Sequence, residues 1–295
     1  MFQNTQFRLN SAHAEQLNND QLRQTAPSIF LDEVSEDRSM RYRMVKTITV
    51  VEAMRDVGFY PVAVQQSGAR SQQGHEVGLH SVRFRHRSAM DMVTNKYGSS
   101  GEEFEEIMLL NSHNTMSSFQ LYLSVFRKVC MNGLVMSSDQ GHISIPHVGN
   151  VVERVVAGAA AMVEHVTELA EARHEMSKIE LDDAERFMFA NAALQLRYSG
   201  RTSPIEAHDV LTRRRIADSA PTLWNTLNVV QENMIRGGLR GHTTTGRRTS
   251  TREITSISSD LAINRMLWSL AEAARNMKET LGTSIDMPAV DIIEA

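Results

Sequence analysis

Hydrophobic and polar residues alternate with a period of two in the first half of the chain and with a helical period in the second half. The alternation is cleanest over residues 119–128. One face carries Phe119, Leu121, Leu123 and Val125, and the other carries Gln120, Tyr122, Ser124, Phe126 and Lys128. Because successive strand residues point to opposite faces, this pattern predicts a strand with one core face and one mixed face.

Further strands are predicted over residues 59–66, 79–87, 107–110 and 142–147. The dipeptide Asn132-Gly133 lies between two apolar triplets, which is the strongest short-range signal for a two-residue hairpin turn. These segments together predict an antiparallel meander.

The second half is predicted to be helical, with helices over residues 151–175, 181–198, 221–236 and from 258 or 259 onward. A short helix is predicted near Thr49, whose hydroxyl and Glu52 form a capping box. The fold class that follows is α+β, an antiparallel β-sheet meander followed by a helical C-terminal half. We divide the chain into an irregular arm (residues 1–40), a β-rich part (41–150), which includes a polar connection at 91–101, and a helical part (151–295) that packs on the sheet.

The strand predicted at 79–87 has a basic face. Val82, Phe84 and His86 share one face, so Arg83, Arg85 and Arg87 share the other. Alternate strand residues lie about 6.7 Å apart, a spacing that suits the phosphates of a stretched nucleic-acid strand. We predict contacts there, with Lys128 beside the row and Tyr122 or Phe126 as stacking platforms. The alternative is an ordinary solvated face of an antiparallel sheet.

A second basic segment, the loop 236–253, separates the last two predicted helices. From Arg236 to Arg252 it contains no acidic residue, and its arginines are Arg236, Arg240, Arg247, Arg248 and Arg252. Its glycines allow close backbone approach to an anion, and its Thr and Ser hydroxyls add donors. We predict contact with a phosphate backbone. A mobile solubilising loop and an oligomer contact with a neighbour's acidic surface are the alternatives.

Composition narrows the classes of protein that remain. A net charge of −4 excludes a polycation, so nucleic-acid contacts have to come from local basic clusters. Hydrophobic residues make up 41% of the chain, but no apolar run is long enough to span a bilayer and no signal-peptide core is present. We therefore expect a cytoplasmic protein without a membrane partner. The single cysteine, Cys130, excludes an internal disulfide.

Two groups of residues resemble metal sites. His113, His142 and His147 have no Cys or carboxylate at ligand spacing, and we expect them to be surface or hydrogen-bonding histidines. The run Glu102, Glu103, Glu105 and Glu106 could hold a divalent ion, although a solvated strand entrance is its usual meaning. No nucleotide-binding loop or nucleophile elbow is present. We therefore predict no catalytic residues and no cofactor, and keep a metal-dependent nuclease as a minor alternative.

Five motifs in order resemble a known family. They are Gly58-Phe59-Tyr60-Pro61-Val62, Leu109 to His113, Phe126 to Leu134, Leu223-Trp224-Asn225 with Gly238, and Asn264 to Trp268. The chain, from about residue 40 to 280, resembles the phage- and plasmid-related family catalogued as domain of unknown function 932. This resemblance implies a mobile-element protein and supplies no catalytic residues. The layout is also similar to single-strand annealing proteins of the RecT/Red-beta class, whose core is a β-sheet meander with helices.

The leading hypothesis is a nucleic-acid-binding protein that holds single-stranded DNA, with a role in annealing or recombination, and that self-associates as annealing proteins do. The alternative is a non-enzymatic interaction or anti-defence factor that acts on a host protein. The alternative predicts weak nucleic-acid binding that is insensitive to salt.

Overall fold

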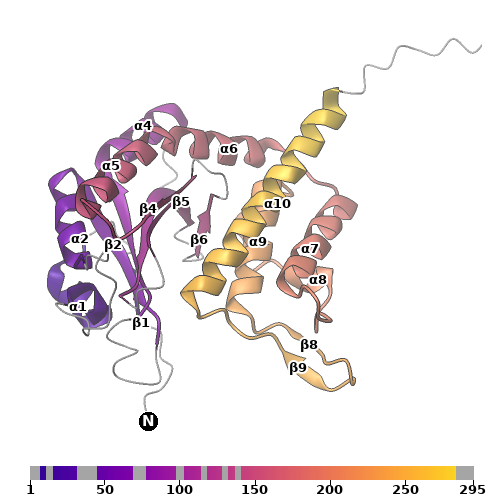
Figure 1. The fold of residues 1–295 in the computed structure, drawn as a ribbon. Coiled ribbons are helices and arrows are strands. Elements are labelled where there is room, and N and C mark those ends of the chain that lie inside the picture. Colours follow the sequence, from indigo (N-terminus) through magenta and orange to yellow (C-terminus); the bar gives the residue numbers. More distant parts are fainter. Residues whose placement is uncertain are drawn as a thin grey trace, which may run out of the picture. The chain divides into compact units, whose positions relative to one another are not determined.

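The computed structural model describes residues 7–10, 16–31, 45–68, 78–97, 103–113, 118–127, 132–136 and 141–283. The chain forms two compact units. Unit 1 contains residues 1–172 and 254–265, and unit 2 contains residues 173–253 and 266–295. The unit boundaries cross helices α6 (Val166–Lys178) and α10 (Ile257–Thr283), which can be followed in Figure 1.

Unit 1 is built on an antiparallel sheet in which neighbours along the chain are neighbours in space. Its strands are β1 (Phe7–Asn10), β2 (Phe59–Gln66), β3 (His80–His86), β4 (Glu103–Asn111), β5 (Phe119–Arg127) and β6 (Asn132–Val135), with β7 (His142–Ile145) also paired to β5. The predicted α+β class is confirmed, and so is the meander.

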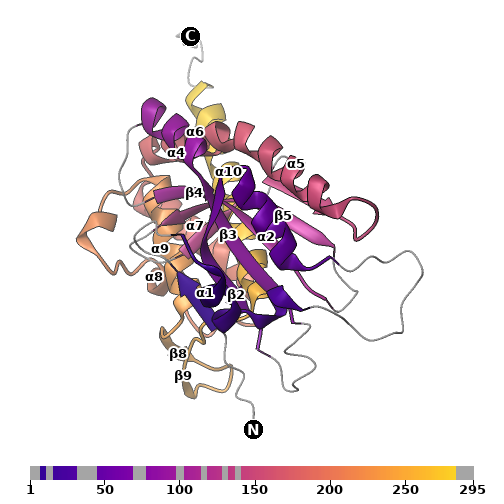
Figure 2. The same cartoon turned by 90° about the vertical axis from the view of Figure 1, so that its left-hand side faces the viewer.

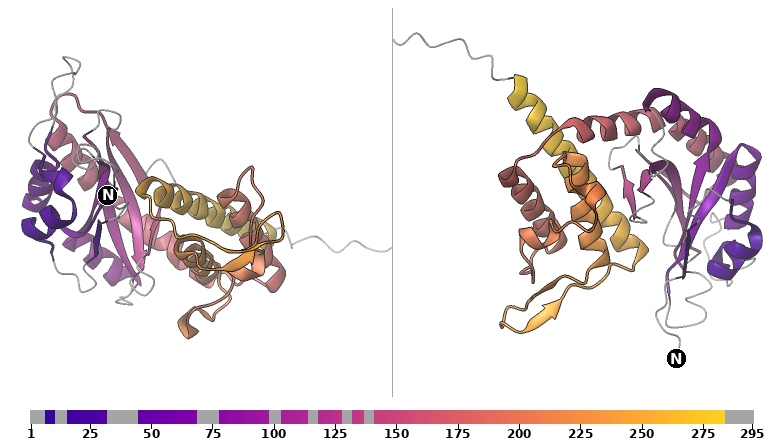
Figure 3. Two further views of the ribbon diagram at one scale, coloured as in Figure 1. Left: turned by 90° about the horizontal axis from the view of Figure 1, so that it is seen from below. Right: turned by 180° about the vertical axis from the view of Figure 1, so that it is seen from behind.

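Helices cover one face of this sheet. Helices α1 (Asn19–Thr25) and α2 (Thr47–Asp56) contact β2, α4 (Arg87–Tyr97) contacts β3 and β4, and α5 (Val151–Glu164) contacts β5. They lie on the same side of the strands in the views of Figures 2 and 3. Val82 and Phe84 point to this face and are fully buried. Burial of such side chains is the main stabilising contribution to the unit.

The second face of the sheet is also apolar at its centre. Leu110, Tyr122 and Val135 form a buried cluster there with Ile257 from the first turn of α10. Met108 and Leu261 pack against the same cluster. The mixed face predicted for residues 119–128 is therefore buried rather than solvated, because a segment more than 100 residues downstream covers it.

The arm predicted to be irregular contains ordered structure. Asn18 caps α1, since its side chain accepts from the Gln21 backbone amide and Gln21 bonds back to the Asn18 amide. Leu22 and Ile29 are completely buried, the latter in a 3₁₀ turn over residues 27–30. The described part of the arm thus belongs to the core of unit 1. The apolar residues of the arm are sparse and leave no periodicity to detect.

Four local predictions were wrong. The single helix predicted over residues 151–175 is two helices, α5 and α6, with a break at His165. Thr49 lies inside α2, whose N-cap is Lys46 without a side-chain cap. The connection at 91–101 is helical over most of its length, within α4. The pair Asn132-Gly133 lies in β6, opposite Arg127 and Phe126, so the β5–β6 connection falls at 128–131, outside the described residues.

Unit 2 contains helices α7 (Asp183–Arg197), α8 (Ala207–Val210) and α9 (Leu223–Arg236), the rest of α10, and a hairpin of β8 (Arg240–His242) and β9 (Arg248–Ser250). The Thr222 side chain caps α9 by accepting from the Asn225 amide, at 3.2 Å. Gly237 ends α9 with a φ of 63°, and a Cβ on it would lie 2.6 Å from the Arg252 carbonyl carbon. Only glycine fits this turn into the hairpin.

Candidate nucleic-acid interface

The basic row predicted on β3 does not face solvent. Arg85 is 1% exposed, the Arg83 side chain is 11% exposed, and Arg87 is the first residue of α4, where it is exposed. The geometric prediction of three outward guanidinium groups is therefore wrong.

The two buried arginines share one carboxylate on the neighbouring strand. Arg85 donates to Glu106 at 2.8 and 2.9 Å, and an Arg83 nitrogen lies 3.1 Å from the other oxygen of Glu106. The Arg85 guanidinium lies 3.9 Å from the ring centre of Phe104, and that of Arg83 lies 4.2 Å from the ring centre of Phe126. The carboxylate and the two aromatic rings thus hold both guanidinium groups inside the fold, so we interpret these arginines as structural.

The aromatic residues predicted as stacking platforms are also internal. Tyr122 is 5% exposed and stacks on the His142 ring at 4.5 Å between ring centres. Phe126 is 1% exposed beneath Arg83. Lys128 lies outside the described residues. A nucleobase has no access to either ring in this arrangement.

The histidines and glutamates that resembled metal sites in the sequence do not form one within the described part of the chain. Each histidine has a different ring partner: His113 lies near His80, His147 near Phe119, and His142 on Tyr122. Of the glutamate run, Glu106 holds the two arginines, Glu103 lies 3.6 Å from Arg127, and Glu102 falls outside the described residues. In the ranges that the structure describes, no group of three His, Cys, Asp or Glu side chains could hold a metal ion.

A buried polar network lies at the other end of β3. The His80 ring bonds Ser28 Oγ at 2.8 Å and Thr47 Oγ1 at 2.9 Å, and Asn111 donates to the same threonine oxygen at 2.9 Å. Burial, and secondarily the nearby His113, lower the pKa of His80 to about 3. His80 and Ser28 are each 1% exposed, so no substrate reaches this serine–histidine pair and the network is structural.

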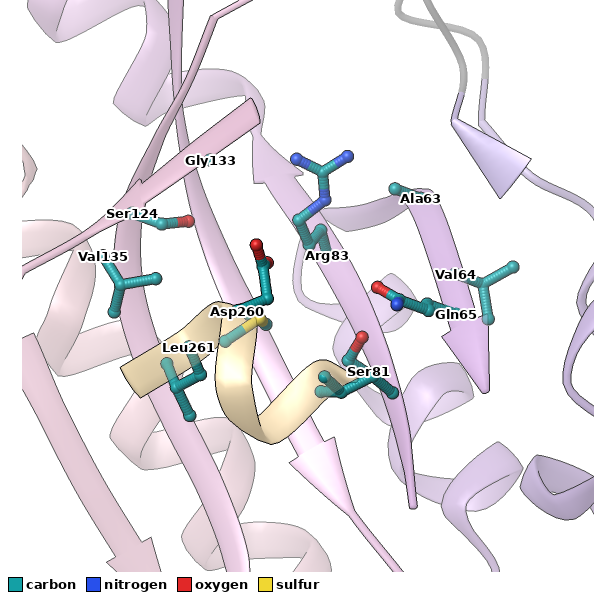
Figure 4. A pocket seen from close by; sticks show the side chains of 12 residues that line it. Ala63, Val64, Gln65, Ser81, Arg83, Ser124, Gly133, Val135, Asp260 and Leu261 are labelled. Atoms are coloured by element: carbon teal, nitrogen blue, oxygen red, sulfur yellow. The ribbon is translucent and has the colours of Figure 1, made fainter. Parts of the chain in front are cut away.

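A small cavity lies on the second face of the sheet, between the strands and the first turn of α10. Gln65, Ser81, Arg83 and Asp260 are among the side chains that line it, as Figure 4 shows. Its volume is about 30 Å³. That is room for one or two water molecules and not for a substrate.

The second basic segment, residues 236–253, differs from the β3 row because it forms the exposed β8–β9 hairpin. Arg240 pairs with Ser250 and His242 with Arg248 across the two strands. Directly opposite residues share a face, so Arg240, His242 and Arg248 lie on one face, and all three are exposed. Gly241 and Thr249 form the other face. A basic row of the kind predicted for β3 is therefore found here.

The tip and base of the hairpin are held by backbone bonds. At the tip, the Thr243 amide donates to the Arg247 carbonyl at 2.9 Å, and Gly246 closes the turn with a φ of 77°. At the base, the Gly238 amide donates to Thr251 and the Thr251 amide to Leu239. The loop is thus an ordered hairpin.

The hairpin is also seated on its own unit. The His242 amide donates to the Pro204 carbonyl at 2.8 Å. A Cβ on Gly241 would lie 1.9 Å from the same oxygen, so the backbone approaches as closely as glycine allows. Arg197 donates to the Arg252 carbonyl at 3.0 Å and Arg214 to the Gly237 carbonyl at 3.4 Å. Arg240 and Arg248 are therefore presented from a fixed backbone.

Positive charge is concentrated around this hairpin. Residues 197–253 contain ten arginines and five acidic residues, a net charge of +5 in a chain whose net charge is −4. Part of this charge is compensated, because Glu232 bonds Arg215 at 2.5 and 2.6 Å and lies 3.2 Å from Arg236. Hydrogen bonding to Glu232 raises the pKa of Arg215 above its ordinary value. Arg240, Arg247, Arg248 and Arg252 remain exposed.

Sequence reasoning missed the arginines that hold the hairpin in place. Arg197 and Arg214 donate hydrogen bonds to backbone carbonyls at the base of the hairpin. Arg215 forms an ion pair with Glu232. The run Arg213 to Arg215 was the available signal. Its structural use depends on contacts with α9, which no spacing along the chain indicates.

Replacing Gly241 by alanine is expected to detach the hairpin from Pro204. The added Cβ cannot occupy a position 1.9 Å from a carbonyl oxygen, so the strand has to move and the His242 bond is lost. We expect a loss of about 1–3 kcal/mol in the free energy of unfolding and faster tryptic cleavage at Arg240 and Arg248. Gly246→Asn is the control, since nothing lies within 4 Å of its Cβ position and asparagine tolerates its φ. Equal behaviour of both variants would contradict the seating.

Comparisons with known proteins assign the family. Residues 34–268 match the family described as Domain of unknown function (DUF932). The "UPF0380 protein YfjQ" of Escherichia coli (strain K12) is 34% identical over 256 residues, 87% of this chain and 90% of the relative. The "UPF0380 protein YafZ" of the same strain is 34% identical over 257 residues, 87% of this chain and 91% of the relative. No solved structure matches the chain significantly.

Among the helices in the described ranges, none is both long and apolar enough to cross a bilayer. The resemblance drawn from five sequence motifs agrees with the family match, which covers four-fifths of the chain. The chain belongs to the DUF932 family.

Proposed function

We propose that this protein binds nucleic acid through phosphate contacts made by the β8–β9 hairpin. The observation that carries the proposal is the exposed basic face of Arg240, His242 and Arg248, continued by Arg247 at the tip. No acidic residue occurs between Arg236 and Arg252. Arginine recognises phosphate bidentately, which suits it to this task.

The geometry of the hairpin supports backbone contact. Arg240 and His242 are alternate residues of one strand, so they lie about 6.7 Å apart along it, comparable with the spacing of phosphates in a stretched strand. Seating on Pro204 and the bonds from Arg197 and Arg214 hold the backbone before any ligand arrives. A pre-formed site loses less conformational entropy on binding than a mobile loop would.

This proposal is narrower than the expectation from sequence. It excludes Arg85, Tyr122 and Phe126, which are buried, and Arg83, whose side chain is 11% exposed and pairs with Glu106. Phosphate contact positions a nucleic acid without reading its sequence. The contacts that the hairpin arginines make are therefore expected to depend on salt and not on sequence.

Replacing both Arg247 and Arg248 by alanine is expected to weaken binding about tenfold at low salt and to flatten the salt dependence. Two lost phosphate contacts lower the slope of log K against log salt by about 1.4 for a single strand. The melting temperature should stay nearly constant, because both side chains are exposed. Fluorescence anisotropy with a labelled oligonucleotide at several salt concentrations measures the effect.

The matched control is Arg154→Ala with Lys178→Ala, which removes the same charge from exposed positions on α5 and α6. This variant should keep the wild-type slope. A hairpin variant with an unchanged slope would remove the hairpin from the binding site.

A second candidate function, binding to a host protein, is favoured by one feature of unit 2. Met188, Phe189, Leu270 and Met277 line an apolar groove of about 210 Å³ between α7 and α10, and the Met188 and Met277 side chains are 66% and 62% exposed. Exposed apolar patches commonly mark interaction sites. If this is the main function, nucleic-acid binding should be weak, insensitive to salt and unaffected by the hairpin variant.

A further inference from the structure

A cleft of about 900 Å³ lies beside the hairpin, entirely within unit 2. One part of its lining comes from the hairpin and the other from the segment that leads into α8. The residues are Ser203, Pro204, Ile205, Glu206, His208, Asp209, Arg240, Gly241, His242, Arg248 and Thr249. Its volume falls within the range of about 300–1,000 Å³ typical of small-ligand sites. One or two nucleotides therefore fit, whereas a double helix does not.

The cleft carries opposite charges on its two parts. Arg240 and Arg248 come from the hairpin, and Glu206 and Asp209 come from the start of α8 and the residue before it. The Glu206 side chain is 81% exposed and that of Asp209 is 29% exposed. The His208 ring lies 3.4 Å from an oxygen of each carboxylate and so joins them into one group. A phosphate is attracted to the arginines and repelled by the carboxylates, which restricts the orientation of a bound nucleotide.

We propose that this cleft binds unpaired nucleotides, with phosphates on Arg240 and Arg248 and with the amino groups of bases donating to Glu206 and Asp209. The inference rests on the proposed function and adds the class of nucleic acid and a base preference. Carboxylates accept hydrogen bonds from the N4 amino group of cytosine. Thymine has a carbonyl oxygen at the equivalent position, which a carboxylate repels.

The preference follows from this chemistry. An oligo(dC) strand should bind more tightly than an oligo(dT) strand of the same length, by about 5- to 10-fold. The two strands are both pyrimidine strands and differ at the position that the carboxylates would read. Duplex DNA should bind more weakly than oligo(dC), because its bases cannot enter the cleft.

The test measures binding of labelled dC12 and dT12 by fluorescence anisotropy at neutral pH and low salt. We expect the wild-type protein to prefer dC12, and Glu206→Gln with Asp209→Asn to lose the preference while binding dT12 more tightly. In the wild-type protein the Asp209 carboxylate accepts a hydrogen bond from the backbone amide of Glu206 at 2.8 Å. Asp209→Asn keeps a side-chain oxygen that can accept the same bond. Thermal denaturation verifies that the variant is folded.

The outcomes separate the two proposals. Equal binding of both strands, with the salt slope still reduced by Arg247→Ala and Arg248→Ala, overturns the base preference and leaves the proposed function standing. A preference for dC12 that survives in the carboxylate variant also overturns the inference. Absence of salt-dependent binding to either strand overturns both.

Discussion

Arg85→Glu is expected to unfold unit 1. Arg85 is 1% exposed and bonds Glu106, whose side chain is completely buried. Arg83, Arg85 and Glu106 form a buried triad. The substitution would place two carboxylates together in this triad, with Arg83 as its one remaining cation. Breaking a buried pair costs about 3–5 kcal/mol, and a reversed charge costs more. Since domains are stable by only about 5–15 kcal/mol, most of the stability should be lost.

Circular dichroism with urea denaturation measures this loss. Arg248→Glu is the matched control, because it makes the same charge reversal on the exposed hairpin and should leave the stability nearly unchanged while weakening the proposed nucleic-acid binding. Phe84→Ala gives the scale for a core cavity on the opposite face of β3, about 3–5 kcal/mol. A folded Arg85→Glu protein of normal stability would contradict the buried triad.

The second large effect concerns acid. His80 has a pKa of about 3 in the folded protein, against 6.5 for a histidine in the unfolded chain. Below pH 6.5 the unfolded chain therefore binds a proton that the folded chain does not, and stability falls as the pH falls through this window. Above pH 6.5 neither state binds this proton, so the contribution of His80 to the free energy of unfolding has its full value. It decreases by about 1.4 kcal/mol per pH unit, and the total loss amounts to about 5 kcal/mol once the pH is below 3.

Urea denaturation at pH 7.5, 6.0 and 4.5 measures the slope. His80→Gln is the control, since glutamine can bond Thr47 without titrating and should show a smaller loss between pH 6.0 and 4.5 by about 2 kcal/mol. His113 is the other titratable group near His80 and is shared by both proteins. If the free energy of unfolding changed with pH in the same way in both proteins, His80 would not have the lowered pKa, and the prediction would be wrong.

Strands β2, β3 and β5 were predictable because each carries its signal locally, whereas β1 and β6 are short and were missed. Period-2 alternation located β2, β3 and β5 to within a residue or two at their ends, and the glycines Gly58 and Gly237 marked helix ends at positive φ. Helix α4 was missed because its apolar residues are few, with Ala89 and Val93 its buried positions. The fold class and the family were accessible from these signals.

The candidate site was half predictable. Alternation grouped Arg83 with Arg85 on one face of β3, and the absence of acidic residues singled out the segment 236–252, which forms the exposed hairpin. Its contact with a phosphate backbone stays a prediction. Neither the alternation nor the charge composition indicates whether a polar face is exposed to solvent. Two arginines on a strand look the same in sequence whether they meet water or a carboxylate on the next strand.

The sequence by itself determined which residues share a face of the strands that it located, where helices α7 and α9 begin and end to within about two residues, and which segment has arginines but no acidic residue. Only the tertiary structure decided which basic face is free. The Arg83 face is internal because Arg83 and Arg85 pair with Glu106, and because Ile257, far along the chain, packs on the same face of the sheet. The basic face of the hairpin is exposed because the opposite face, at Gly241, packs against Pro204. Arg240 and Arg248 therefore remain in solvent. Both outcomes depend on contacts between residues distant in sequence, and local patterns hold no information about these.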